Sequence, residues 1–302
     1  MARGVYWSAL AVAVAALVAV AVVIGMAISP EPAEPPAAPD VNDSSRGDQV
    51  RRVPASVLVI AHRGASAYAP HDTVAAARES VARGADALEV DVRQTRDGRL
   101  VALFAPTLAP TTNVEQLYPG RAPWRVESFT LAEVRRLDAG SWFAPRFRGE
   151  RVPTLRQIVS AVEGSDVRVV VEVKSPGRYP GIAERVVQEV RRLPGRYLEI
   201  ECFETGFLRR LASRSLPVDL GVTGTPPASR LAAVASFADA VNPQAASVDA
   251  AYVDRAHRAG LEVKVWSLNT VASMRRALAI GVDGIYTHRP DMLTGLDGEQ
   301  AR

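Results

Sequence analysis

Nine short apolar runs, most of them separated by amphipathic helical patterns, constrain the fold of this chain more than any other feature. The runs span residues 57–61, 87–92, 100–104, 167–173, 197–203, 218–222, 238–241, 262–266 and 284–287. The main helical patterns span residues 73–83, 154–162, 182–193, 206–214, 250–259 and 270–280. Strands that alternate with helices predict a parallel sheet, because parallel neighbours need a crossover between them.

The number of units favours a closed barrel. Eight or nine strand-like runs in roughly 250 residues predict a (β/α)8 barrel over residues 53–302 rather than an open doubly wound sheet. No GxGxxG motif follows the first run, which weakens a dinucleotide-binding alternative. Nine candidates for eight positions leave one accessory strand, and the gap from Val92 to Leu100 is too short for a crossover helix. We therefore expect an irregular barrel, with residues 105–164 forming an excursion over one mouth.

The N-terminus reads as a membrane anchor. No charged residue occurs from Gly4 to Pro30, a length that suffices to cross a bilayer. Pro30 follows the small-residue site at Ser29 and disfavours cleavage, so we expect residues 1–30 to be a transmembrane helix rather than a removed signal peptide. Arg3 precedes the span and no Lys or Arg follows it until Arg46, which predicts a single-pass protein with a cytoplasmic N-terminus and an extracytoplasmic barrel. Residues 31–52 read as a Pro-rich disordered linker.

Composition excludes several other classes. The net charge is only +3, and Arg is spread along the chain without a dense basic run, which argues against nucleic-acid binding. Cys202 is the only cysteine, so neither an internal disulfide nor a zinc site of several cysteines can form. We read this cysteine as a small buried residue.

Acidic residues end two of the apolar runs. Glu89 and Asp91 are two positions apart and therefore point to the same face of a strand, and Glu172 lies near the end of VRVVVEVKS. Active sites of (β/α)8 barrels lie at the C-terminal ends of the strands, so these carboxylates are expected to meet. Three carboxylates can hold a hard divalent cation such as Mg²⁺ or Ca²⁺.

Basic residues end the same runs. His62 and Arg63 follow the first run, and Lys174 lies two residues after Glu172. Arg63 and Lys174 can neutralise phosphate oxygens, and an imidazole can move protons near neutral pH. Each feature alone is common on a protein surface, but their coincidence at successive strand ends predicts a site that holds a metal ion and a phosphate together.

Seven separated segments between residues 58 and 291 carry a family resemblance. They are AHRG, GADALEVDV, TRDG, DAGSWFAPRFRGERVPTL, VEVKS, GLEVKVWSLN and GVDGIYTHRP. In these segments, and in their order, the chain resembles the glycerophosphodiester phosphodiesterase family. The resemblance implies a barrel enzyme of lipid headgroup metabolism, which uses one divalent metal to split a small-molecule glycerophosphodiester into glycerol phosphate and an alcohol. It also implies site roles: metal ligands Glu89, Asp91 and Glu172, acid–base residue His62, and phosphate contacts Arg63 and Lys174.

The chain departs from the family pattern within the site itself. Where the family has His-Asp after TRDGRLVAL, this chain has Phe104-Ala105, so the second acid–base histidine is missing. The family's Pro-Glu-Asn-Thr is Pro-His71-Asp-Thr, and the acidic residue expected before the last Arg-Pro is His288. Loss of a general acid or base typically costs about 10²–10⁴ in rate.

Three interpretations follow from these departures. In the first, the chain is an active enzyme in which His71 or His288 supplies the missing proton-transfer group. In the second, it is a pseudoenzyme that binds a phosphodiester or lipid headgroup without cleaving it. In the third, a substrate hydroxyl attacks and a cyclic phosphate is released. Trp266, in VWSLN, is expected either to contact substrate or to pack in the barrel core.

Overall fold

The computed structural model describes residues 57–193, 195 and 197–299. These residues belong to one compact unit, Val50–Arg302. The predicted anchor and linker, residues 1–52, lie outside the described residues, so the structure does not test them. Within the described part of the chain, no helix combines the length and the apolar character needed to cross a bilayer.

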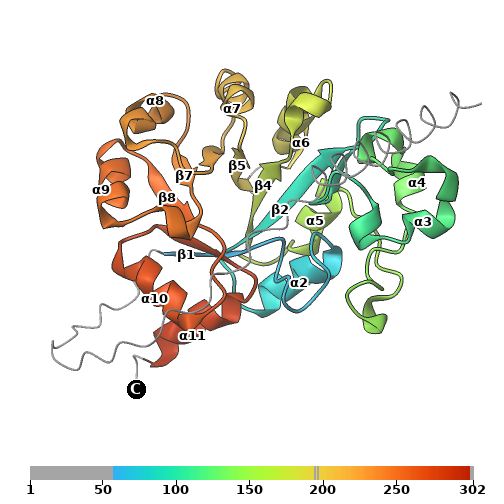
Figure 1. The fold of residues 1–302 in the computed structure, drawn as a ribbon, viewed down its shortest axis with the longest axis horizontal. Coiled ribbons are helices and arrows are strands. Elements are labelled where there is room, and N and C mark those ends of the chain that lie inside the picture. Colours follow the sequence, from blue (N-terminus) through green and yellow to red (C-terminus); the bar gives the residue numbers. More distant parts are fainter. Residues whose placement is uncertain (1–56, 194, 196, 300–302) are drawn as a thin grey trace, which may run out of the picture. The chain divides into compact units, whose positions relative to one another are not determined.

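Eight parallel strands close into the predicted barrel (Figure 1). They are β1 (Leu58–Ala61), β2 (Ala87–Gln94), β4 (Arg168–Val173), β5 (Tyr197–Cys202), β6 (Asp219–Thr223), β7 (Ala240–Asn242), β8 (Glu262–Val265) and β9 (Gly284–Thr287). β1 closes the barrel, because Ala61 pairs with Leu88 of β2 on one side and with Thr287 of β9 on the other. The expected (β/α)8 architecture is confirmed.

The accessory strand is β3 (Leu100–Ala102). It pairs antiparallel with the end of β2, with Val92 opposite Ala102. Residues 95–99 form the turn between the two strands, held by the hydrogen bond from the Thr95 N–H to the Arg99 carbonyl (2.9 Å). A connection this short permits a hairpin but no crossover, which is why β3 lies outside the parallel ring.

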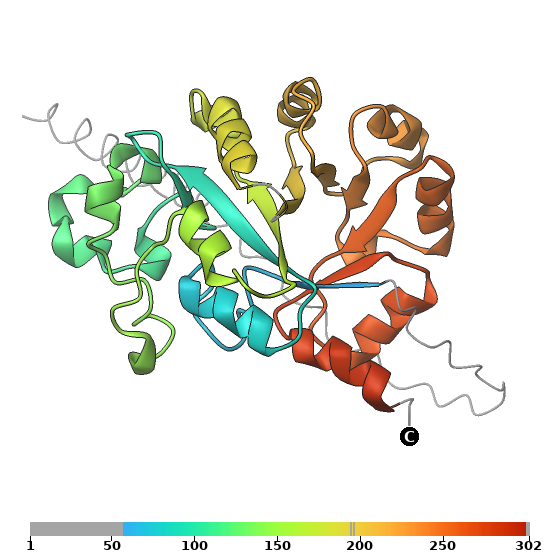
Figure 2. The same cartoon turned by 180° about the vertical axis from the view of Figure 1, so that it is seen from behind.

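Helices cover the outside of the barrel (Figure 2). They are α2 (Val74–Ala82), α5 (Leu155–Ala161), α6 (Ile182–Arg192), α7 (Thr205–Ala212), α8 (Leu231–Ala235), α9 (Ala250–Arg258), α10 (Val271–Ala279) and α11 (Pro290–Glu299). Side-chain caps define where several begin: Thr73 accepts a hydrogen bond from the N–H of Ala76, and Thr154 forms a capping box with Gln157. The apolar faces of these helices pack on the strands and form the main core.

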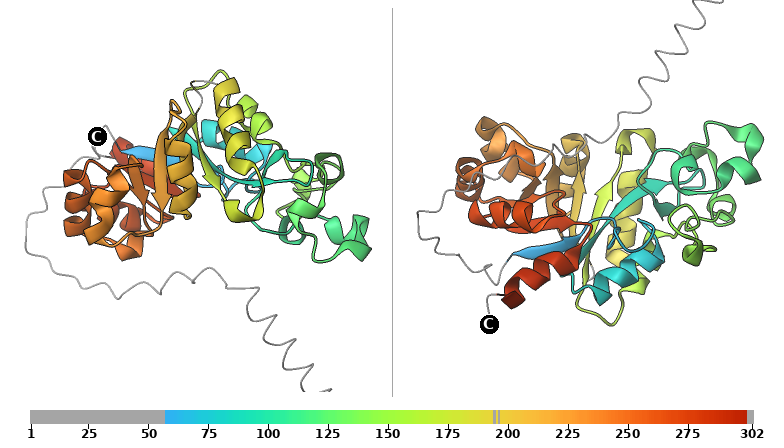
Figure 3. Two further views of the ribbon diagram at one scale, coloured as in Figure 1. Left: turned by 90° about the horizontal axis from the view of Figure 1, so that it is seen from above. Right: turned by 60° about the horizontal axis from the view of Figure 1, so that its bottom comes forward.

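The excursion after β3 has a small core of its own. It contains α3 (Val114–Leu117), α4 (Leu131–Val134) and four short 3-10 turns, η1 (Ala109–Thr111), η2 (Pro119–Arg121), η3 (Val126–Ser128) and η4 (Pro145–Phe147). Buried Val114, Phe129 and Leu137 belong to its separate apolar cluster. In Figure 3 the segment, in green, lies beside the barrel. It ends before α5, which packs against α2 as part of the barrel's helical layer.

Candidate active site

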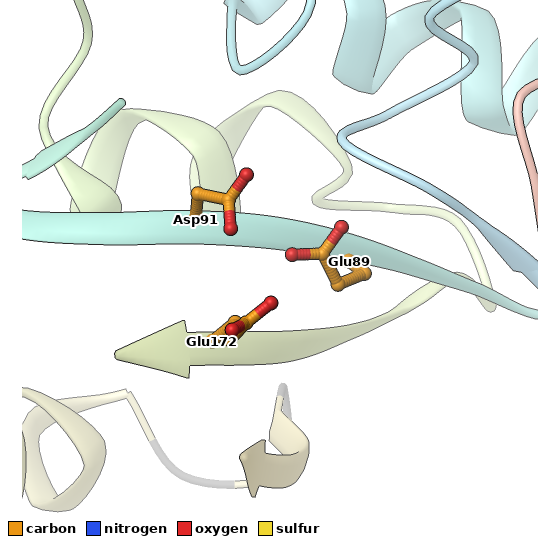
Figure 4. A group of neighbouring side chains, drawn as sticks. All are labelled: Glu89, Asp91 and Glu172. Carbon is orange, nitrogen blue, oxygen red and sulfur yellow. The ribbon is translucent and has the colours of Figure 1, made fainter. Parts of the chain in front are cut away.

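Three carboxylates converge between β2 and β4, as predicted (Figure 4). Glu89 and Asp91 project from β2 and Glu172 from β4, and the parallel register places Asp91 directly beside Glu172. One oxygen from each carboxylate lies within 4.8 Å of the others. All three residues are buried, so nothing but the protein and whatever binds there can balance their charge.

The donor set fits a hard divalent cation. Burial, followed by the nearby carboxylates of Asp91, Glu201 and Glu172, raises the pKa of Glu89 well above its usual value. Glu89 Oε1 is buried and has no hydrogen-bond partner among the described residues. A cation that bound there would satisfy this oxygen and relieve the repulsion between the carboxylates. Oxygen donors without sulfur favour Mg²⁺ or Ca²⁺ over softer metals.

Two cations border the carboxylates. The Arg63 side chain places Nε 3.0 Å from Asp91 Oδ2, and its backbone N–H donates to Glu89 Oε2 at 2.8 Å. Lys174 Nζ lies 3.1 Å from Asp91 and 2.9 Å from Glu172. Burial works to lower the pKa of Lys174, but Asp91 and Glu172 outweigh burial and raise it. Lys174 is therefore charged, and the guanidinium of Arg63 is charged at any physiological pH.

His62 and His288 form a pair beside the metal site. Nδ1 of His62 lies 2.9 Å from Nε2 of His288, and Nε2 of His62 lies 3.8 Å from Glu89 Oε2. The other ring nitrogen of His288, Nδ1, lies 3.2 Å from Nδ2 of Asn269. Burial and then the charge of Arg63 lower the pKa of both imidazoles, to about 4 for His288, so the pair is neutral at pH 7.

His71 occupies the mouth of the barrel with a carboxylate of its own. Its Nδ1 lies 2.9 Å from Asp72 Oδ2, and the other Asp72 oxygen accepts the backbone N–H of Asp91 at 3.0 Å. The imidazole meets the Trp142 ring with centroids 5.1 Å apart and the Phe104 ring at 6.3 Å. The excursion thus contributes to the mouth through Trp142.

Phe104 fills the place of the missing histidine. Its ring lies against the Arg63 guanidinium, with Cζ 3.5 Å from the ring centroid, and Lys174 Nζ is 5.0 Å away. A phenyl ring here holds the cations by cation–π contact but transfers no proton. Lys174 Nζ also lies 5.7 Å from the ring centroid of Phe203, which is 55% exposed and meets the partly buried Trp266 at 6.4 Å between centroids. Trp266 packs on the barrel core and also contacts the exposed Phe203.

A cluster of buried polar residues lies inside the barrel beside the three carboxylates. Glu201 accepts the Tyr286 hydroxyl at 2.7 Å and also the Asn242 amide. Lys264, almost fully buried, pairs with Glu199 at 2.9 Å. Glu201 is the register partner of Glu172, so these contacts leave the interior side chains around Glu172 little freedom to repack.

The residues predicted from sequence gather at one end of the barrel, and the structure adds three more. The gathered residues are His62, Arg63, His71, Glu89, Asp91, Glu172, Lys174, Trp266 and His288. Sequence reasoning missed Asp72, Asn269 and Phe203. Asp72 could have been predicted from the sequence, because it adjoins His71. Asn269 and Phe203 could not, because their roles depend on which side chains face them in the folded protein.

This fold and site define a class of (β/α)8-barrel enzymes in which three carboxylates suited to a divalent cation, two basic side chains and imidazoles meet at one mouth. The sequence matches the Glycerophosphoryl diester phosphodiesterase family over residues 62–292. The chain belongs to that family.

Individual relatives agree with this assignment. A glycerophosphodiester phosphodiesterase of Caldanaerobacter subterraneus is 32% identical over 248 residues, which cover 79% of this chain and 97% of the relative. The crystal structure of a glycerophosphodiester phosphodiesterase from Agrobacterium tumefaciens is similar with a TM-score of 0.67 and 29% identity, covering 79% of this chain and 99% of that one. An Oleispira antarctica phosphodiesterase, solved with the product sn-glycerol-3-phosphate, shares the fold with a TM-score of 0.71 at 22% identity, covering 78% and 95%.

Proposed function

We propose that this chain is a membrane-anchored phosphodiesterase that hydrolyses glycerophosphodiesters to glycerol phosphate and an alcohol, with Mg²⁺ or Ca²⁺ as its metal. One observation carries the proposal: the carboxylates of Glu89, Asp91 and Glu172 lie within 4.8 Å of one another, beside the partly buried basic side chains of Arg63 and Lys174. Family membership supports the same reaction.

The basic residues would bind and orient the phosphodiester. Arg63 and Lys174 now pair with the carboxylates, and a bound cation would take over those oxygens and free the basic side chains for phosphate. The cation would act as a Lewis acid toward a phosphoryl oxygen. Fixed charges of this kind stabilise the negative charge that builds up in the transition state. His62, which faces Glu89, would border the same phosphoryl group.

The test is a product assay on the full-length chain in detergent. We expect glycerol phosphate to form from glycerophosphocholine with Mg²⁺ or Ca²⁺ and to stop on addition of chelator. Phosphorus NMR of the product separates direct hydrolysis from release of a cyclic phosphate. Absence of any product with either metal would overturn the proposal.

The phenylalanine at position 104 favours a second candidate function, binding without cleavage. Its ring, stacked on Arg63, leaves a phosphate-binding site without an imidazole at position 104. A domain of this kind could bind a phosphodiester or lipid headgroup without cleaving it. Calorimetry with glycerophosphocholine distinguishes the two functions, because saturable binding without turnover supports the binder.

We also propose that the barrel is anchored to the membrane and lies on its extracytoplasmic side. The uncharged stretch from Gly4 to Pro30 is long enough to span a bilayer, and Arg3 before it favours a cytoplasmic N-terminus. An anchored barrel would meet phosphodiesters released from lipids near the membrane surface. In sealed inside-out membrane vesicles we expect the barrel to resist added protease. Digestion of the barrel in intact vesicles would contradict this orientation.

A further inference from the structure

His71 is held at the mouth by its neighbours. It lies in the loop between β1 and α2, and its side chain is 17% exposed. The Trp142 ring and the Phe104 ring both approach it edge to face, with centroids 5.1 and 6.3 Å away. The imidazole therefore has a fixed orientation and still reaches solvent, where a substrate must enter.

Asp72 fixes which nitrogen of His71 faces the mouth. Asp72 Oδ2 lies 2.9 Å from His71 Nδ1, and Asp72 itself is 4% exposed. Its Oδ1 accepts the Asp91 N–H, and its own N–H donates to the Arg63 carbonyl at 3.1 Å. The carboxylate therefore accepts a hydrogen bond from Nδ1 and directs Nε2 away from itself.

The other candidate groups either have partners within the protein or face the metal-site carboxylates. Both ring nitrogens of His288 are used, by His62 and by Asn269. His62 uses Nδ1 for His288 and faces Glu89 with Nε2. Phe104 carries no transferable proton. Within the described part of the chain, His71 Nε2 makes no hydrogen bond to protein, so this nitrogen is open to a ligand at the mouth.

We propose that His71 is the catalytic residue that protonates the leaving alcohol, with Asp72 as its positioning residue. This inference rests on the proposed hydrolysis. The water oxygen bonds to phosphorus while the phosphorus–alkoxide bond breaks. The alkoxide oxygen keeps that electron pair and takes the Nε2 proton of His71. Of the two water protons, one stays on the new P–OH group and one passes to solvent, and solvent returns a proton to His71.

The test compares two leaving groups on the full-length chain with Mg²⁺. Glycerophosphocholine loses an alkoxide, which needs a proton, whereas a p-nitrophenyl phosphodiester loses a stable phenolate, which does not. For His71→Ala we expect the kcat on glycerophosphocholine to fall by about 10²–10⁴, with little change on the p-nitrophenyl ester. Added imidazole should restore part of the lost rate. His71→Gln, which keeps a polar side chain, should behave in the same way if His71→Ala folds poorly.

Asp72→Asn isolates the positioning role. An Asn side chain can still accept the Asp91 N–H, but it places an amide instead of a carboxylate against His71. We expect a smaller fall than in His71→Ala, again confined to glycerophosphocholine, with an unchanged melting temperature. His257→Ala serves as the matched control, because His257 lies on α9 and pairs with Asp283. Its rates should equal those of wild type on both substrates.

Two outcomes would overturn the assignment of His71. One is an equal loss of rate on both substrates, which indicates a role in binding or folding. The other is undiminished hydrolysis of glycerophosphocholine by both His71 variants. Failure of the underlying function is distinguishable from these, because wild type would then hydrolyse neither substrate with Mg²⁺ or Ca²⁺.

Discussion

The imidazoles of His62 and His288 lie stacked, with ring centroids 4.9 Å apart and an angle of 10° between the ring planes. Asn269 determines how protons are placed in this pair. Its Oδ1 accepts the His288 backbone N–H at 2.9 Å, so its NH₂ group is the one that faces His288 Nδ1. An amide NH₂ only donates, which assigns the His288 proton to Nε2 and the His62 proton to Nε2 as well. His62 thus offers a hydrogen-bond donor toward Glu89 and a bound phosphate, whereas the family resemblance implies an acid–base role.

This tautomer can be measured directly. We expect nitrogen NMR to show His62 protonated on Nε2 in wild type at pH 7. In His288→Asp the new carboxylate would accept from both Asn269 and His62, so the His62 proton should move to Nδ1. A wild-type His62 already protonated on Nδ1 would contradict the assignment.

Stability should depend on pH through His288. Burial, followed by Arg63, lowers the pKa of His288 from 6.5 to about 4. The unfolded chain therefore takes up this proton at a higher pH than the folded chain, and the free energy of unfolding falls as the pH drops from 6.5 toward 4. Between pH 7 and 4.5 we expect a loss of about 2 kcal/mol from this group, absent in His288→Gln. Denaturant titrations with saturating Mg²⁺ measure it, with His257→Gln as control.

Removal of one carboxylate should separate metal binding from folding. Glu89→Gln keeps an acceptor for the Arg63 N–H but removes a buried acid whose pKa is raised by burial and by its neighbours. Without metal, the variant should melt at a higher temperature than wild type at pH 8. With Mg²⁺ at about 100 times its Kd, wild type should gain about 2.7 kcal/mol and the variant far less. The exposed Glu163→Gln is the control, and an equal metal response in Glu89→Gln would refute this ligand.

A histidine introduced at position 104 should replace the function of His71. Phe104→His with Ala105→Asp places an imidazole beside Arg63, at some loss of cation–π contact. In a His71→Ala background we expect these changes to raise the kcat on glycerophosphocholine at least about tenfold above that of His71→Ala alone. A gain of this size lies within the range of a general acid. A folded triple variant no faster than His71→Ala would count against proton transfer from this part of the mouth.

Much of the fold could be predicted from the local pattern of apolar and polar residues in the sequence. Apolar runs of strand length alternate with amphipathic helical stretches. Few folds bury both the strands and the apolar faces of the helices, and the structure adopts one of them, the barrel. The same reasoning located the metal site: Glu89 and Asp91 share a face because strand side chains alternate, and parallel register brings Asp91 beside Glu172. The status of β3 was not evident from its apolar run alone, because pairing direction depends on the neighbouring strand.

The sequence by itself determined the barrel, the strand ends that carry the site and the absence of a histidine at position 104. Only the tertiary structure decided what each histidine does. His62 and His288 are 226 positions apart, and their contact depends on how β1 and β9 pair across the closure of the barrel. His71 and Asp72 adjoin in sequence, but their orientation depends on the Arg63 carbonyl and the Asp91 N–H. Strand periodicity fixes the direction of a side chain on a strand, whereas a side chain in a loop points wherever its tertiary contacts hold it.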